Sequence, residues 1–81
     1  MLTGAQIRMA RGFARLSIKG LAVASEVAES TIKRMELVDG VPASSAANLR
    51  KVQVALEAAG IEFIPENGGG AGVRLRRKEK E

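Results

Sequence analysis

The sequence predicts a mainly α-helical domain of four helices, followed by a C-terminal two-stranded β-hairpin. Apolar residues recur at helical spacing over residues 3–59. After Gly60 the apolar spacing changes to every second residue, which is typical of strands. The 81 residues suit one domain, near the lower limit for a chain that builds its own core. We therefore expect a helical domain at 1–60, a hairpin at 61–77 and a disordered tail at 78–81.

The first helix is expected from about Thr3 to Arg15. Thr3 is followed three residues later by Gln6, which is the spacing of a capping box. Its core-facing stripe consists of Ile7, Ala10 and Ala14. Gly12 weakens a helix by about 1 kcal/mol relative to alanine, so we expect close packing at that position.

Two short helices joined by a tight turn follow. Ser17 caps a helix over residues 18–25, residues 26–27 form the turn, and the next helix spans about 28–37. The apolar residues that hold this pair together are Leu21, Ala22, Val27, Ile32 and Met35. The residues left on the outer face of the second helix are Ser30, Thr31, Lys33 and Arg34. Such a pair is how a small protein inserts a helix into the major groove of DNA.

The fourth helix has the clearest pattern. Residues 38–42 form a loop, because Asp-Gly and the residue before Pro42 both resist helix formation. The helix begins at Ser44 or Ser45, and Gly60 supplies its C-terminal stop. Its apolar stripe consists of Leu49, Val52, Leu56 and Ala59.

The hairpin is expected to consist of strands at 61–64 and 73–76. Because a two-stranded hairpin is marginal alone, it must pack on the fourth helix, pair with a second chain, or both. Thin monomer stability and open strand edges together predict a homodimer. The interface candidates are Ile61, Phe63, Val73 and Leu75. The basic cluster at 74–78 is either an arm for the DNA backbone or, the reading we favour, a guard against edge aggregation.

Composition excludes several classes of site. The chain contains no cysteine and no histidine, so zinc fingers, disulfides and thiol or imidazole catalysis are excluded. We expect no enzymatic activity and no cofactor or metal, since the carboxylates are scattered without a matching motif. A formal net charge of +4 suits a polyanionic partner. The sequence has no apolar run of membrane-spanning length and no signal-peptide pattern, so we expect a cytoplasmic protein without a membrane partner.

The helical part resembles the Cro/C1-type (XRE) helix-turn-helix family. The matching residues are Ile7-Arg8, Arg11, Leu16-Ser17, Leu21-Ala22 and the run from Val27 to Glu36. The resemblance covers about residues 3–59, and the tail after Ala58 is similar to that of short bacterial regulators of this type. It implies a lambda-repressor-like fold, with double-stranded DNA as the partner.

The resemblance also assigns roles to individual residues. It makes the helix over 28–37 the recognition helix, in which Arg34 grips guanine and adds about 1–3 kcal/mol of discrimination. The base-reading candidates are Glu29, Ser30 and Arg34. The phosphate-contact candidates are Ser17, Lys19, Thr31 and Lys33. Arg11 and Glu36 match positions that form a structural ion pair in the family.

Each candidate also has a structural reading. Lys33 and Arg34 fit a solvated helix face, and Glu29 fits a partner for the helix dipole. Ser30 and Thr31 fit capping or packing roles. The departures from the family pattern are Ile18 where a polar residue is usual, Glu26 where glycine is common, and the carboxylate of Glu29.

These features predict a sequence-specific transcriptional regulator, repressor or activator, that controls its own operon. It would bind a pseudo-palindromic operator as a homodimer, with half-sites about 34 Å apart. RNA polymerase or another regulator is a further candidate partner. The alternative is a protein-binding helix-turn-helix module, an antiactivator or antitoxin, because Ile18, Val23 and Leu37 are apolar where a DNA reader is usually polar.

Overall fold

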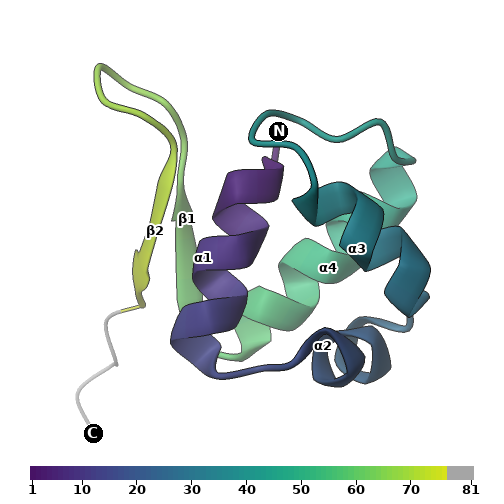
Figure 1. Cartoon of the computed structure of the whole chain (residues 1–81). Helices are drawn as coiled ribbons and strands as arrows, with labels where there is room; N and C mark the ends of the chain where they lie inside the picture. Colours follow the sequence, from purple (N-terminus) through teal and green to yellow (C-terminus); the bar gives the residue numbers. More distant parts are fainter. Residues whose placement is uncertain (77–81) are drawn as a thin grey trace, which may run out of the picture.

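The computed structural model describes residues 1–76, which form four helices and one antiparallel hairpin (Figure 1). The elements are α1 Gly4–Ala14, α2 Ile18–Ser25, α3 Glu29–Glu36, α4 Ala46–Ala58, β1 Ile61–Ile64 and β2 Gly72–Leu75. The prediction of a mainly α fold with a terminal hairpin is therefore confirmed. The expected tail at 78–81 and the last hairpin residue, 77, lie outside the described residues.

Side-chain caps start three of the four helices. Thr3 and Gln6 form the capping box expected for α1, while Ser17 accepts from Gly20 N and Ser45 accepts from Asn48 N. These caps explain why the predicted helix bounds agree with the structure to within a residue or two. The start of α3 differs, because Ala28 occupies its cap position and supplies no side-chain hydrogen bond.

Two helices end in a left-handed residue that is not glycine. Arg15 ends α1 with φ 59° and Glu26 ends α2 with φ 61°. A side chain disfavours this conformation, which glycine adopts freely. The turn between α2 and α3 therefore carries local backbone strain at Glu26.

The core is aliphatic and draws on every helix and on β1. Its fully or nearly buried apolar residues are Leu2, Ile7, Ala10, Leu21, Val27, Ile32, Met35, Leu49, Val52, Leu56 and Ile61. The prediction that Ala59 belongs to the α4 stripe is wrong, because Ala59 is exposed in the C-cap position, where the helix ends. Gly60 then turns the chain into β1 with φ 98°.

The close approach expected at Gly12 occurs instead at Gly4. A Cβ atom built on Gly12 meets nothing within 4 Å. A Cβ atom on Gly4 would lie 2.0 Å from the carbonyl oxygen of Val38 and 2.3 Å from that of Met35. Gly4 N also donates to the carbonyl oxygen of Gly40 at 2.8 Å. The start of α1 thus packs directly on the chain that leaves α3.

The hairpin covers one side of the helical domain (Figure 1). Strand β2 pairs with β1 in antiparallel register, Phe63 opposite Val73, and it starts at Gly72, one residue before the predicted start. β1 packs mainly on α4 and β2 on α1. Ile61 is only 1% exposed, so its place among the dimer candidates is wrong: its side chain fills the core of its own chain.

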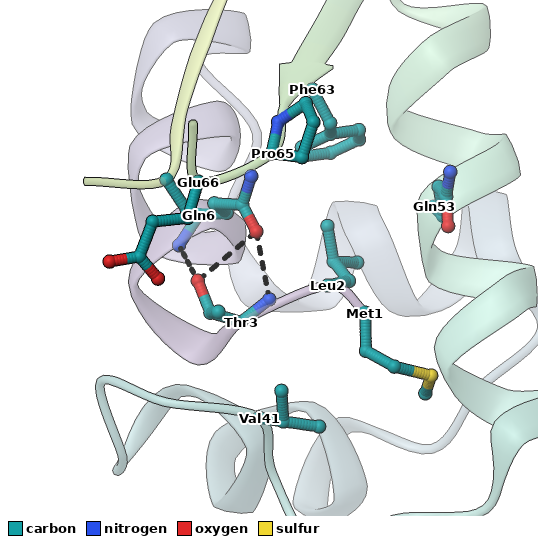
Figure 2. Close-up of a pocket in the computed structure, with 10 residues that line it drawn as sticks. Met1, Leu2, Thr3, Gln6, Val41, Gln53, Phe63, Pro65 and Glu66 are labelled. Carbon is teal, nitrogen blue, oxygen red and sulfur yellow. Dashed lines mark hydrogen bonds between the residues drawn. The ribbon is translucent and has the colours of Figure 1, made fainter. Parts of the chain in front are cut away.

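Gln6 fastens the hairpin to α1. Its amide nitrogen donates to the carbonyl oxygens of Ile64 at 3.1 Å and Gly72 at 2.9 Å. Its amide oxygen accepts from the backbone nitrogen of Thr3 at 3.0 Å (Figure 2). One buried side chain thus completes the helix cap and holds both strands. No helix within residues 1–76 has the length and apolar character needed to cross a membrane.

Candidate nucleic-acid interface

Helix α3 is held on the domain by one face and leaves the opposite face open. Ile32 and Met35 are completely buried. Helical spacing places Ser30 and Arg34, four residues apart, on the side opposite this pair. Both are exposed. α3 therefore presents a polar line to solvent from a rigidly packed helix.

The remaining sequence-predicted residues surround this line. Lys33 and Glu29 are exposed, and Thr31 is half-buried on the flank of α3. Ser17 and Lys19 are exposed at the start of α2, which packs against α3. The candidates for base and phosphate contacts thus lie on two adjoining helices, and all but Thr31 are exposed.

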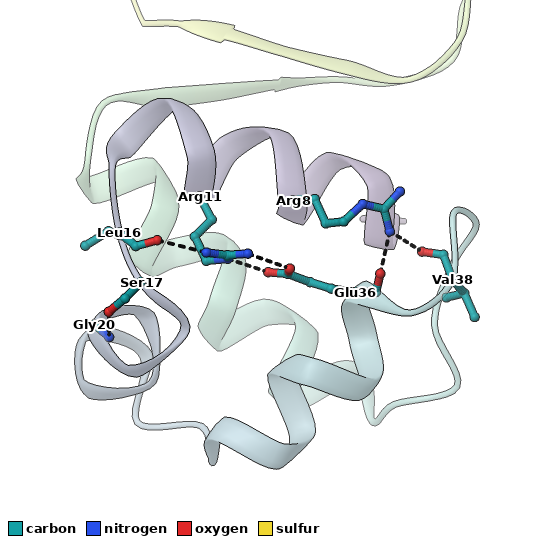
Figure 3. Close-up of polar contacts among 7 residues, drawn as sticks. All are labelled: Arg8, Arg11, Leu16, Ser17, Gly20, Glu36 and Val38. Atoms are coloured by element: carbon teal, nitrogen blue, oxygen red, sulfur yellow. Dashed lines mark hydrogen bonds and ion pairs between the residues drawn. The ribbon is translucent and has the colours of Figure 1, made fainter.

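An ion pair fixes the C-terminal end of α3. Arg11 Nε donates to Glu36 Oε2 at 2.8 Å, and Arg11 Nη2 donates to Glu36 Oε1 at 2.9 Å (Figure 3). Arg11 Nη1 also donates to the carbonyl oxygen of Leu16 at 3.1 Å, in the segment that leads to Ser17. Arg11 therefore ties α1 both to α3 and to the start of α2.

This pair is shielded from solvent. The side chain of Glu36 is 8% exposed and that of Arg11 is 25% exposed. The hydrogen bond and charge of Glu36 raise the pKa of Arg11, against the lowering effect of burial. Arg11 and Glu36 therefore neutralise each other, and neither side chain is placed to bind an external ligand.

Arg8 makes a second link that the sequence reasoning did not identify. Its guanidinium donates to the carbonyl oxygens of Glu36 and Val38 and pairs with the carboxylate of Asp39. These acceptors lie at the last residue of α3 and just after it, so Arg8 compensates for carbonyls that a helix end leaves unsatisfied. The sequence signals were its position one turn before Arg11, on the neighbouring flank of α1, and its place among the residues that carry the resemblance.

The exposed residues Ser17, Lys19, Glu29, Ser30, Lys33 and Arg34 form what we call the α2–α3 surface. Its charge is mixed. The three ion pairs among residues 1–76 do not include Lys19, Lys33 or Arg34, so these cations are available to a ligand. Arg34 makes one long contact, 3.5 Å from its Nη2 to Thr31 Oγ1. Glu29 lies in the first turn of α3, where the helix dipole favours a carboxylate.

The N-terminus of α2 contributes a fixed hydroxyl. Ser17 Oγ accepts from Gly20 N at 2.9 Å, which uses it as an acceptor and leaves its O–H able to donate outward (Figure 3). Ile18, the next residue, is half-buried and packs against the core. Its apolar side chain thus has a packing role at a position where the resembled family usually carries a polar residue.

A hollow of about 440 Å³ lies on another part of the surface, between the N-terminal segment, α4 and the hairpin (Figure 2). Thr3 and Gln6 contribute polar groups to it, but they bond to each other and to the hairpin. Within residues 1–76 no group of three potential metal-ligating side chains comes together. The α2–α3 surface is therefore the stronger candidate site.

No profile of a known protein family matches this chain. No curated protein matches it in sequence either. Support for a function therefore comes from the geometry and charge of the α2–α3 surface and from the resemblance in its residues.

Proposed function

We propose that this protein is a sequence-specific DNA-binding regulator of transcription with a Cro/C1-type helix-turn-helix. In this proposal α2 and α3 form the motif and α3 enters the major groove. The observation that carries it is the open line of Ser30 and Arg34 on α3, opposite the buried Ile32 and Met35. A short helix with a fixed inner face and a free polar outer face suits the reading of base edges.

The proposed roles follow from side-chain chemistry. Arg34 donates two hydrogen bonds to guanine, Ser30 donates to or accepts from a neighbouring base, and Glu29 accepts from a cytosine amino group. Lys19 and Lys33 bind phosphates on either side and position the helix without reading sequence. Ser17 and Thr31 add hydroxyl contacts to the backbone. Arg11 and Glu36 hold α3 in place and do not touch DNA.

A single α3 reads too few base pairs to define a genomic site, so the regulator acts as a homodimer on a pseudo-palindromic operator. The two α3 helices then lie in successive major grooves, about 34 Å apart. Repression by promoter occlusion and activation through contact with RNA polymerase both fit this arrangement. Control of its own operon is the proposed setting.

A protein-binding module on the same scaffold is the second candidate. The observation that favours it is the exposure of Val23, 74%, and Leu37, 81%, two large apolar side chains on α2 and after α3. Isolated exposed apolar residues are ordinary on protein surfaces, and these two come from different elements. An antiactivator or antitoxin would use them to bind another regulator or a toxin.

A band-shift titration with the DNA directly upstream of the gene separates the two candidates. Wild type is compared with Arg34→Ala and with Arg50→Ala, a control that removes an exposed arginine from α4. We expect saturable binding that resists competitor DNA and weakens between about 50 and 200 mM salt, because phosphate contacts release counterions. Arg34→Ala should weaken this binding roughly tenfold or more, because each lost arginine–guanine pair removes about 1–3 kcal/mol, and Arg50→Ala should keep wild-type binding. Weak binding that is equal for all three proteins would favour the protein partner.

A further inference from the structure

We propose that a second copy of this chain docks on an apolar strip formed by Met9 and Phe13 of α1 and Leu75 of β2, beside the open edge of β2. This deepens the proposed function, which needs two copies, and its test uses protein without DNA. These side chains are 42%, 58% and 62% exposed, and Phe13 is one of only two aromatic residues in the chain. We call Met9, Phe13 and Leu75 the α1–β2 strip.

Helix geometry places Met9 and Phe13 on one face of α1, and the course of β2 brings Leu75 beside this face. Gln6 and Phe13 are seven residues apart and so lie on nearly the same face of α1, with Met9 one turn before Phe13. Gln6 bonds to the carbonyl oxygen of Gly72, the first residue of β2. α1 and β2 run in the same direction (Figure 1). Seven helical residues rise about 10.5 Å and three strand residues about 10 Å, which brings Phe13 level with Leu75.

The outer edge of β2 is open within the described residues, because the sheet contains only β1 and β2. Arg76 N donates to the carbonyl oxygen of Gly60 at 2.7 Å, which fixes the alternation of the antiparallel ladder. Arg74, opposite Glu62, then belongs to a hydrogen-bonded pair. Val73 and Leu75 belong to non-hydrogen-bonded pairs, so their backbone N–H and C=O groups point away from β1, toward the outer edge.

Arg74 and Arg76, the basic side chains of the 74–78 cluster that lie within the described residues, do not guard that edge. Arg74 donates from Nε to Glu62 Oε1 at 3.1 Å and from Nη2 to Glu62 Oε2 at 3.0 Å, across the sheet and away from the edge. Arg76 donates to the carbonyl oxygen of Glu57 at the end of α4. Arg74 and Arg76 thus bond within their own chain instead of lying along the edge of β2. This edge is left free to pair with another strand.

Charge selects one way for two copies of β2 to pair. Only Val73 and Leu75, whose backbone groups point outward, can bond to β2 of the second copy across the two-fold axis between them. This leaves three antiparallel registers, which set Val73 opposite Val73, Val73 opposite Leu75, or Leu75 opposite Leu75. Two of them set Arg74 opposite Arg74 or Arg76 of the second copy, where like charges repel. The third sets Val73 opposite Val73 and Arg74 opposite Gly72, a residue without a side chain. In this register β2 is complementary to a second copy of itself, and the two hairpins form one four-stranded sheet. The two α1–β2 strips then lie on either side of the two-fold axis that relates the copies.

Oligomeric state without DNA tests the interface. Sedimentation should show a wild-type dimer, whereas Phe13→Glu and Leu75→Glu should be folded monomers by circular dichroism. Val23→Glu is the matched control, since Val23 is also a large exposed apolar residue, 74% exposed, but lies on α2. It should remain a dimer. A monomeric wild type, or Phe13→Glu and Leu75→Glu proteins as dimeric as the control, would overturn the proposal. Loss of DNA binding with an intact dimer would contradict only the proposed function.

Cysteine pairing tests the register, because the chain has no cysteine of its own. A Cβ atom at Gly72 meets open space, so Gly72→Cys should be tolerated. In the proposed register Gly72 and Arg74 of different copies form a close pair, with Cα atoms about 4.5 Å apart, which a disulfide can bridge. Mixed Gly72→Cys and Arg74→Cys proteins should therefore cross-link on mild oxidation. Faster cross-linking of Arg74→Cys alone would contradict this register.

Discussion

Arg11 and Glu36 form a bidentate ion pair that joins α1 to the last residue of α3. The two N–O distances are 2.8 and 2.9 Å, and both side chains are largely shielded from water. Because the third arm of Arg11 bonds to the carbonyl of Leu16, the pair also fixes the entry to α2. One guanidinium thus helps to orient both proposed DNA-contacting helices.

Removing one member of this pair should cost more than removing both. Glu36→Gln leaves Arg11 half-buried beside a neutral amide, and we expect it to lower the free energy of unfolding by about 2–4 kcal/mol. In Arg11→Met with Glu36→Leu no charge is left unpaired, so the double variant should be less destabilised than either single variant. Urea denaturation of wild type, Arg11→Met, Glu36→Leu and the double variant gives the coupling energy. Strictly additive effects would mean that the pair contributes no stability.

Gly4 and Gly12 form a matched pair on α1. Gly4→Ala drives a methyl group into the carbonyl oxygens of Met35 and Val38, and we expect it to cost about 3 kcal/mol or more. Gly12→Ala meets open space and should stabilise the helix by about 0.5–1 kcal/mol. Thermal unfolding of both variants checks this. A stable Gly4→Ala protein would show that the start of α1 is not held against the end of α3.

Glu26 carries the strain of the turn between α2 and α3. Glu26→Gly should stabilise the domain by about 0.5–1 kcal/mol, because glycine adopts the left-handed conformation without steric cost. Glu26→Ala removes the same carboxylate but keeps the strain, so it serves as the control. Chemical denaturation should give Glu26→Gly a higher free energy of unfolding than both wild type and Glu26→Ala. Equal gains from the two variants would point to the charge and not to the backbone.

The hairpin should weaken in acid through Glu62. The hydrogen bonds and charge of Arg74 lower the pKa of Glu62. Because the pKa is lower in the folded chain, the pair stabilises the hairpin above the unfolded-state pKa, and this contribution disappears as the pH falls through the folded-state pKa. NMR titration of Arg74→Gln should show a higher pKa for Glu62, whereas Arg50→Gln should leave it unchanged. An unchanged pKa in Arg74→Gln would contradict the pairing.

Local signals in the sequence were enough to predict the helices. Thr3, Ser17 and Ser45 bond to backbone groups only three residues away, so the residue types themselves mark the helix starts. The hairpin was predictable from apolar alternation, but its orientation was not. Ile61 and Leu75 lie opposite each other, yet one is buried and the other exposed, because the helices beneath cover only part of the strand face.

Contacts between distant residues were not predictable from local pattern. Gln6 was expected as half of a capping box, but its amide also bonds to Ile64 and Gly72, far along the chain. The sequence predicts close packing at Gly12, whereas the close approach is at Gly4, where the chain after α3 crosses. The Arg11–Glu36 pair came from family resemblance alone. The DNA roles of Glu29, Ser30 and Arg34 remain predictions.

Selection from a library of randomised DNA duplexes, with wild type and Arg34→Ala in parallel, tests the central claim most directly. Wild type should enrich a two-fold symmetric site with half-site centres about 10–10.5 base pairs apart. Arg34→Ala should enrich the same site with the preference for guanine lost at one position in each half. No enriched site, or an identical one for both proteins, would contradict the reading of DNA by α3.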